Sequence, residues 1–160
     1  MKKILVPVDF SAQSINAFRF SLDFAKRSGA SITLLHVLAL PVIHDSALMP
    51  VSAFRKPLLD DLTALAEKKF TRLIRAFNDD SVRVNTSTIS GPIHASILNY
   101  LETEKCDIII MGTKGASGIK EWTIGSNAER MVRTSPVPVI SIKNYQPDHA
   151  IKNIVRLVSF

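Results

Sequence analysis

Apolar residues recur along the chain in two alternating patterns, one typical of buried strands and one typical of amphipathic helices. Short apolar runs predict strands over residues 3–8, 31–38, 81–89, 106–111 and 137–142. Between them, apolar residues at helical spacing predict helices over about 12–28 and 57–77, a third opening at Gly91-Pro92, and a last one over about 126–134. This alternation predicts an open α/β fold, with a parallel sheet and helices on both faces.

Local signals support several of these boundaries. Ser11 is placed to cap the first helix and Gly29 to end it, while Pro92 suits the first position of the third helix. Three consecutive isoleucines in "CDIIIM" (106–111) indicate a strand that is buried on both faces, as in a parallel sheet. A long loop is expected before the second helix, as a lid or partner surface, and it holds three prolines: Pro41, Pro50 and Pro57.

Two predicted strands end in unusual segments. "PVDFS" (7–11) follows the first strand, and "MGTKGASGIKEWTIGS" (111–126) follows the fourth. Ligands of open α/β sheets bind beyond the carboxyl ends of the strands, where the strand order reverses. Since the carboxyl ends of parallel strands share one edge, both segments are expected to open on the same edge. That edge is the candidate site.

The glycine-rich segment matches neither common phosphate-binding loop. It lacks a Gly-Lys-Ser/Thr sequence, and its first three glycines are three apart: Gly112, Gly115 and Gly118. Glycine nevertheless lets a backbone approach a ligand, and Gly125-Ser126 begins a helix whose N–H groups favour an anion. These features allow a cradle for a sugar and a phosphate. They equally allow ordinary turns and a capping box formed by Ser126 and Glu129.

The chain resembles the universal stress protein family over residues 1–143. The resemblance rests on "ILVPVDFS", "LLHV", "DIIIMGTKG", "GSNAE" and "PVPVISI". It also rests on the Gly-x2-Gly-x9-Gly-Ser/Thr pattern of the nucleotide-binding members, which is complete here: Gly112, Gly115, Gly125 and Ser126. The resemblance implies an open five-stranded parallel sheet sandwiched by helices, Rossmann-like and similar to the adenine nucleotide alpha hydrolases. It further implies a homodimer, commonly formed through the last strand, and membership of the ATP-binding subfamily.

Carried over by position, the resemblance implies a set of residues that bind ATP, and bound ATP is expected to carry Mg²⁺ on its phosphate oxygens. The residues are Pro7, Val8 and Asp9 at the adenine and ribose, Val37 at the adenine, Met111, Gly112 and Thr113 at the ribose, Gly115 near the phosphates, and Gly125, Ser126 and Asn127 at the phosphate tail. Many members carry an apolar residue where this chain has Asn127, whose amide can still donate. Lys114 and Lys120 either add charge near the phosphates or are simply solvated, and Trp122 either folds over the nucleotide or packs on a partner subunit.

The sequence shows no side-chain set that is built for turnover. Asp9 is the one carboxylate expected in the site, so a paired acid and base is not visible. His36 is expected to be packed or hydrogen-bonded, and Cys106 to be inert. The predicted function is that of an ATP-binding, nucleotide-responsive regulator in a stress response. The alternatives are a dimerising scaffold whose glycine loop stays empty, and a slow ATP-hydrolysing or adenylyl-transfer enzyme.

Composition narrows the range of partners. The single cysteine allows no intramolecular disulfide, and no apolar stretch reaches the ~18–20 residues that cross a bilayer. The apolar run at the N-terminus is too short for a signal peptide, so a cytoplasmic location without a membrane partner is expected. The net charge is +6, from 20 basic and 14 acidic residues, but the basic residues are scattered over helix ends and faces. No nucleic-acid partner is therefore expected.

Residues 144–160 form a C-terminal extension to the predicted domain of residues 1–143. Its end, "IKNIVRLVSF" (151–160), echoes "MKKILVPVDF" (1–10), so the extension resembles the first strand of a second such domain. An additional edge strand or a helix is the alternative. In either case its apolar residues should seek cover. We therefore expect the homodimer to form through the last strand together with this extension.

Overall fold

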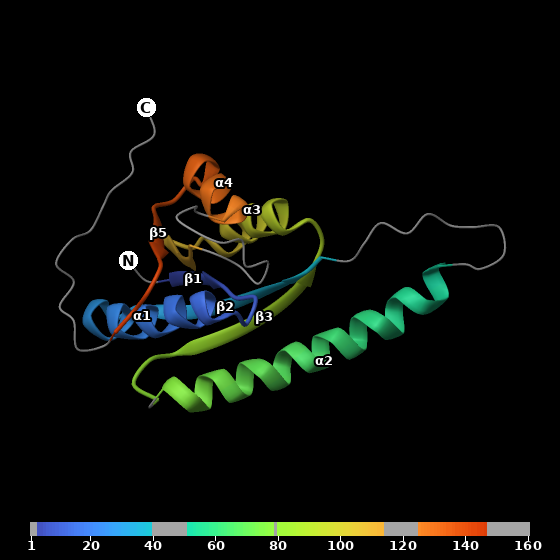
Figure 1. Cartoon of the computed structure of the whole chain (residues 1–160), viewed down its shortest axis with the longest axis horizontal. Coiled ribbons are helices and arrows are strands. Elements are labelled where there is room, and N and C mark those ends of the chain that lie inside the picture. Colours follow the sequence, from blue (N-terminus) through green and yellow to red (C-terminus); the bar gives the residue numbers. More distant parts are fainter. Residues whose placement is uncertain (1–2, 40–50, 79, 114–124, 147–160) are drawn as a thin grey trace.

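The computed structural model describes residues 3–39, 51–78, 80–113 and 125–146. Strands and helices alternate through these segments (Figure 1). The elements are β1 (Lys3–Pro7), α1 (Ala12–Ser28), β2 (Ser31–Leu38), α2 (Val51–Phe77), β3 (Val84–Ser90), α3 (Ile93–Glu104), β4 (Ile108–Gly112), α4 (Ser126–Thr134) and β5 (Val139–Ile142). The predicted α/β fold is confirmed.

The five strands form one sheet in the order β3-β2-β1-β4-β5, and all of its neighbouring pairs are parallel. From β1 the chain first adds β2 and β3 on one side, and it then crosses to add β4 and β5 on the other. The strand order therefore reverses between β1 and β4, and a ligand crevice is expected beyond the carboxyl ends of these two strands. β3 and β5 are the two edges.

Side chains of the central strands alternate between two cores. Ile4 and Ile110 face the core that includes Phe18 of α1 and Phe70 of α2. Leu5 and Ile109 face the other core, which α3 and α4 complete. Figure 1 shows the same arrangement, with α1 and α2 on one side of the sheet and α3 and α4 on the other. Residues 108–110 are buried on both faces, as the three isoleucines predicted.

Both ends of α1 follow their local signals. The hydroxyl of Ser11 accepts a bond from the backbone N–H of Ser14 at 3.3 Å, and Gly29 ends α1 with φ 66°. The prediction for α3 was wrong by one position, because Pro92 is the residue before the helix and not its first residue. Its φ of −63° and ψ of 122° are the extended conformation that a capping position takes.

The start of α2 differs more. We predicted a loop through Pro57 and a helix over 57–77, but the helix begins at Val51 and includes Pro57. Pro57 is the seventh residue of the helix and is exposed; it removes one backbone hydrogen bond, yet the helix continues through it. Pro41 and Pro50 lie outside the described residues, and so does the loop that was expected to be a lid.

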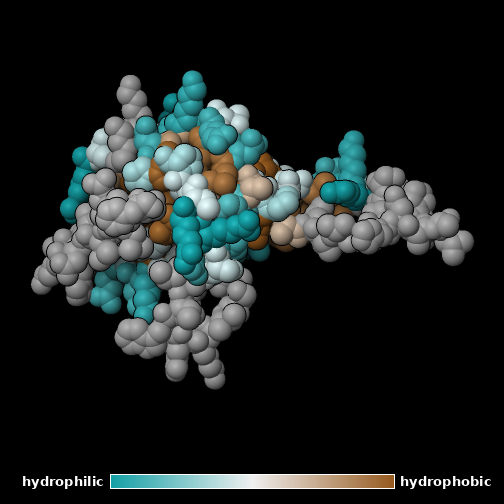
Figure 2. All heavy atoms as spheres, turned by 90° about the horizontal axis from the view of Figure 1, so that it is seen from above, coloured by the Kyte–Doolittle hydropathy of each residue, from teal (hydrophilic) through white to brown (hydrophobic). Residues whose placement is uncertain are grey.

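The two halves of α2 have different surroundings. Its C-terminal half buries Ala66, Phe70 and Leu73 against the sheet, whereas its N-terminal part reaches beyond the sheet (Figure 1). Leu58 in the N-terminal part is 48% exposed, and Leu65 near the middle of the helix is 49% exposed. Figure 2 shows brown hydrophobic surface between hydrophilic side chains, both on the body of the molecule and on the part that projects from it.

After β5 the chain turns back across α1. The hydroxyl of Tyr145 donates to the carboxylate of Asp23, and its ring packs edge-on against Phe20, with 5.6 Å between the ring centroids. These contacts attach the start of the C-terminal extension to the domain. The remainder of the extension, residues 147–160, lies outside the described residues, so its likeness to a first strand stays a prediction.

Candidate functional site

A cavity opens beyond the carboxyl ends of β1 and β4, where the strand order reverses. Its volume is about 140 Å³, counted as the space that the centres of water molecules can occupy. Because a bound water needs roughly 10–15 Å³ by this measure, the cavity has room for about ten waters or for a small organic group. The described residues thus place a ligand-sized space at the edge that the sequence indicated.

The structure brings most of the predicted site residues together around this cavity. The lining includes Pro7, Val8, Asp9, Val37, Met111, Gly112, Thr113, Gly125, Ser126 and Asn127. Gly115 lies outside the described residues, as do Lys114, Lys120 and Trp122. The part that each residue would play in binding stays a prediction.

Sequence reasoning missed the remaining lining residues: Ser14, Leu35, His36, Ile93, Ile97 and Ala128. Two signals were available. α3 begins directly after β3, so its first turn must reach the same edge of the sheet, and this places Ile93 and Ile97 there. Leu35 and Val37 are two apart on β2 and therefore share one face of the sheet.

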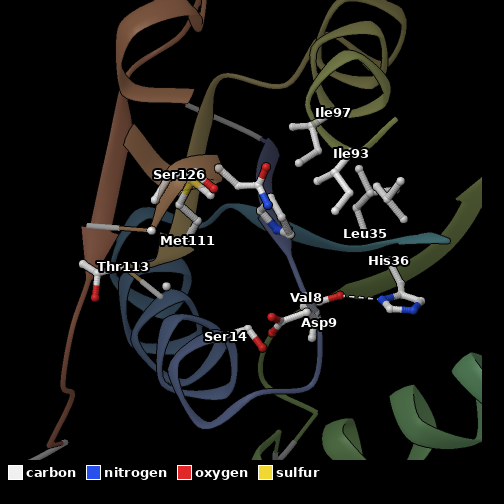
Figure 3. A pocket seen from close by; sticks show the side chains of 16 residues that line it. Val8, Asp9, Ser14, Leu35, His36, Ile93, Ile97, Met111, Thr113 and Ser126 are labelled. Carbon is white, nitrogen blue, oxygen red and sulfur yellow. Dashed lines mark hydrogen bonds between the residues drawn. The ribbon is translucent and has the colours of Figure 1, made fainter. Parts of the chain in front are cut away.

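The cavity has an apolar side and a polar side. Figure 3 shows Leu35, Ile93 and Ile97 gathered along one wall, while Asp9 and Ser14 lie at another. An apolar wall suits a flat aromatic ring, and hydroxyl and carboxylate groups suit a sugar or other polar group. The arrangement therefore fits a ligand that is apolar at one end and polar at the other.

Hydrogen bonds at Asp9 and at Val8 hold the loop from β1 to α1. One carboxylate oxygen of Asp9 accepts bonds from the backbone N–H and the hydroxyl of Ser11, at 3.0 and 2.6 Å. The carbonyl of Val8 lies 2.7 Å from Nδ1 of His36 (Figure 3). Since a carbonyl oxygen only accepts, Nδ1 carries the proton. The prediction that His36 is hydrogen-bonded is confirmed, and His36 also lines the cavity.

On the opposite side, two backbone bonds join β4, β5 and α4. The N–H of Thr113 donates to the carbonyl of Ile142 at 3.0 Å, and the N–H of Gly125 donates to the carbonyl of Thr113 at 2.6 Å. The start of α4 is therefore fastened to the end of β4. The hydroxyl oxygen of Thr113 is buried and has no hydrogen-bond partner among the described residues. A buried hydroxyl without a partner is costly, so it favours a polar ligand group or a water beside it.

The capping box suggested for α4 is wrong. Gly125 is the capping position and has no side chain with which to cap the helix, and Ser126 is already helical. Glu129 instead forms an ion pair with Arg133 at 2.9 Å. The first backbone bond of α4 runs from the N–H of Glu129 to the carbonyl of Gly125, so the N–H groups of residues 126–128 precede the helical ladder. N–H groups of this kind favour an anion.

Gly112 has a packing requirement of its own. A Cβ atom at this position would lie 2.8 Å from the carbonyl carbon of Gln13 and 2.9 Å from its oxygen. These are backbone atoms in the first turn of α1, which cannot swing aside as a flexible side chain does. The absence of a side chain at Gly112 therefore lets α1 pack directly against the end of β4.

The described residues hold few reactive groups. They include no cluster of three or more His, Cys, Asp or Glu side chains that would hold a metal ion. Burial raises the pKa of the Cys106 thiol, which keeps the described cysteine in its less reactive form. Of the helices that the structure describes, none combines the length and apolar character needed to cross a membrane.

His94 connects the two helices that line the far side of the cavity. Its Nε2 lies 2.8 Å from the hydroxyl oxygen of Thr134. That hydroxyl donates its proton to the carbonyl of Arg130, so Nε2 must be the donor toward Thr134. Burial, and then the charge of Arg130, lower the pKa of His94 from its ordinary value of 6.5. The folded protein therefore favours neutral His94.

Acidification is expected to destabilise the protein through His94. The stability that neutral His94 contributes is fully present above the unfolded pKa of 6.5. It is lost as the pH falls below that value, because the unfolded chain takes up the proton first. In His94→Gln the amide can still donate to Thr134 but does not titrate. The melting temperature should therefore drop less between about pH 7.5 and pH 5.5 in this variant than in the wild type. An equal fall in both proteins would contradict the assignment.

Comparisons with known proteins agree with this architecture. The family model described as the Universal stress protein family matches residues 1–143. A universal stress protein of Methanocaldococcus jannaschii is 31% identical over 153 residues, covering 89% of this chain and 94% of the relative. The solved structure of the universal stress protein UspA from Lactobacillus plantarum is 27% identical with a TM-score of 0.78, covering 89% of this chain and 97% of that one.

Two other solved structures share the fold at lower identity. One is a universal stress protein in complex with cAMP, which is 18% identical with a TM-score of 0.62 and covers 90% of this chain and 98% of that one. The other is the universal stress protein from Archaeoglobus fulgidus in complex with dAMP. It is 17% identical with a TM-score of 0.63, and the match covers 89% of this chain and 98% of that one.

Proposed function

The chain belongs to the universal stress protein family, and from this premise we propose that it binds ATP, together with Mg²⁺, in the cavity between β1 and β4. The observation that carries the proposal is the division of the cavity into an apolar wall and a polar wall that ends at the start of α4, where the capping residue is a glycine. Two solved relatives hold cAMP and dAMP, which are adenine nucleotides of the same chemical class.

The residues fit the parts of the nucleotide. The adenine would lie on the apolar wall beside Val37 and Leu35, and the ribose would lie between Asp9 and Thr113. The backbone N–H groups at the start of α4 would meet the phosphates, where the helix dipole favours negative charge. Mg²⁺ would be held chiefly by the phosphate oxygens.

We propose that the bound nucleotide regulates the protein rather than being consumed. A ligand that binds one conformation more tightly shifts the population toward that conformation, and this requires no chemical step. β5 is an edge strand, and its backbone offers the surface through which a second copy would pair. The scaffold without a nucleotide remains the second candidate, because Gly112 has a packing role that needs no ligand.

Thermal unfolding with and without Mg-ATP tests the proposal. We expect micromolar affinity, so saturation at 100 times the dissociation constant should add roughly 2.7 kcal/mol to the stability of the folded state. For a chain of this size that gain raises the melting temperature by about 5–10 °C. An unchanged melting temperature with Mg-ATP, cAMP and dAMP alike would leave the scaffold as the better description. Steady phosphate release from ATP would instead indicate an enzyme.

A further inference from the structure

Phe10 stands out because it combines a rare backbone conformation with a set of ring contacts. It follows Asp9 directly and has φ 62°, in the left-handed region. Such a conformation is uncommon for a bulky residue and has to be imposed by its surroundings. Phe10 itself does not line the cavity formed by the described residues, whereas Val8 and Asp9 just before it do. An imposed conformation beside a ligand site suggests a functional constraint.

The ring of Phe10 lies where three elements meet. Its centroid is 4.9 Å from that of His36 on β2 and 5.2 Å from that of Phe70 on α2. The ammonium group of Lys69, also on α2, lies 5.0 Å from the centroid of the same ring. Phe70 is 1% exposed and belongs to the core, so it gives Phe10 a fixed surface. The loop from β1 to α1 is thereby attached to α2.

His36 connects Phe10 to the cavity. Its ring packs on Phe10, and its Nδ1–H donates to the carbonyl of Val8 (Figure 3). Both Val8 and His36 line the cavity. A displacement of Phe10 would therefore move the loop that presents Asp9, and it would also remove the packing partner of the imidazole that holds Val8.

We propose that Phe10 is a positioning residue that couples α2 to the nucleotide site. This inference rests on the proposed function, since it concerns how tightly the cavity holds its ligand. By clamping residues 8–10 between β2 and α2, Phe10 fixes the loop before the ligand arrives, so that binding need not order it. The coupling is reciprocal: a nucleotide on Val8 and Asp9 would hold Phe10 against Phe70 and make local opening of α2 rarer.

Three variants separate this role from a general contribution to packing. Phe10→Leu removes the ring, and Phe10→Gly removes the ring while accepting φ 62° without strain. The matched control is Phe24→Leu. Phe24 is also half-buried against the same core, but its ring stacks on that of Phe20 within α1, with 6.0 Å between the ring centroids. Phe24 does not line the cavity formed by the described residues.

Calorimetric titration with Mg-ATP should show affinity falling roughly tenfold in both Phe10 variants, because the loop must then be ordered on binding. The affinity of Phe24→Leu should stay within about twofold of the wild type, although its stability falls. If Phe10→Leu and Phe10→Gly also bind within twofold of the wild type, the inference is overturned. Absence of binding to the wild type would instead overturn the proposed function, and the inference with it.

Hydrogen exchange supplies a measurement that packing alone would not change. In the wild type, Mg-ATP should slow exchange of the amides around residues 66–73 of α2, and Phe10→Gly at saturating nucleotide should lose this protection. Amides at the C-terminal end of α1, remote from the cavity, serve as the internal comparison. Equal exchange in α2 with and without nucleotide, in a wild type that binds it, would overturn the coupling alone.

Discussion

Replacing Gly112 by alanine is expected to lower the free energy of unfolding by about 2–3 kcal/mol, the upper part of the range for overpacking, because the contact is with backbone atoms. The new methyl group would lie 2.8 and 2.9 Å from the carbonyl carbon and oxygen of Gln13, so the end of β4 and the first turn of α1 must separate. Urea unfolding measures the loss. Because Gly112 also lines the cavity, nucleotide affinity should fall with stability.

Gly29→Ala is the matched control for this substitution. Gly29 has φ 66°, but a Cβ there would meet no atom within 4 Å. Its replacement should therefore cost only the left-handed backbone conformation, about 1–2 kcal/mol, and it should leave nucleotide affinity unchanged. If Gly112→Ala unfolds at the same urea concentration as the wild type, the contact between β4 and α1 is looser than the structure indicates.

The sequence predicted the ends of α1 and the burial of β4 well, because the causes there are local. Ser11 and Gly29 mark the ends of α1 through contacts within a few residues, and these are visible in the sequence itself. The isoleucines of β4 are buried on both faces because a central parallel strand has no solvent side. These regularities were sufficient to predict that the segments after β1 and β4 open on the same edge of the sheet, and to indicate that edge as the site.

Prediction failed where contacts between distant segments decided the outcome. The sequence from Ser126 to Glu129 satisfies the pattern of a capping box, yet the bond from Gly125 to the carbonyl of Thr113 fixes the start of α4 one residue earlier. Likewise, no local signal marks Phe10, because its conformation depends on Phe70 of α2 and His36 of β2. Such roles become visible only once the fold brings the partners together.

The glycine pattern of the sequence therefore joins residues with different physical duties. Gly112 is required by helix packing, as the distance to Gln13 shows, whereas Gly125 has φ −60° and ψ 145°, which any residue adopts easily. A side chain at position 125 costs no backbone strain, so its effect reports on the cavity that Gly125 lines. The two glycines should thus respond differently to substitution.

Gly125→Val is expected to weaken Mg-ATP binding about a hundredfold, equivalent to roughly 2.8 kcal/mol, because the branched side chain would occupy space at the proposed phosphate end of the cavity. Stability in the absence of nucleotide should fall by only about 0.5–1 kcal/mol, the cost of a branched residue in place of glycine at a capping position, since valine favours extended backbone and the N–H that donates to Thr113 is retained. Calorimetric titration and urea unfolding of the same preparation measure the two quantities.

Gly125→Ala separates the effect of side-chain volume from the effect of removing glycine, because it keeps the same backbone and N–H but adds only one methyl group. Its affinity should lie between those of the wild type and Gly125→Val, so that the loss grows with side-chain volume and not with the removal of glycine as such. Wild-type affinity in the valine variant would mean that the phosphates do not lie against the start of α4. A graded loss of affinity, with stability changed only by the small capping cost, would place them there and would set Gly125 apart from Gly112, where affinity and stability must fall together.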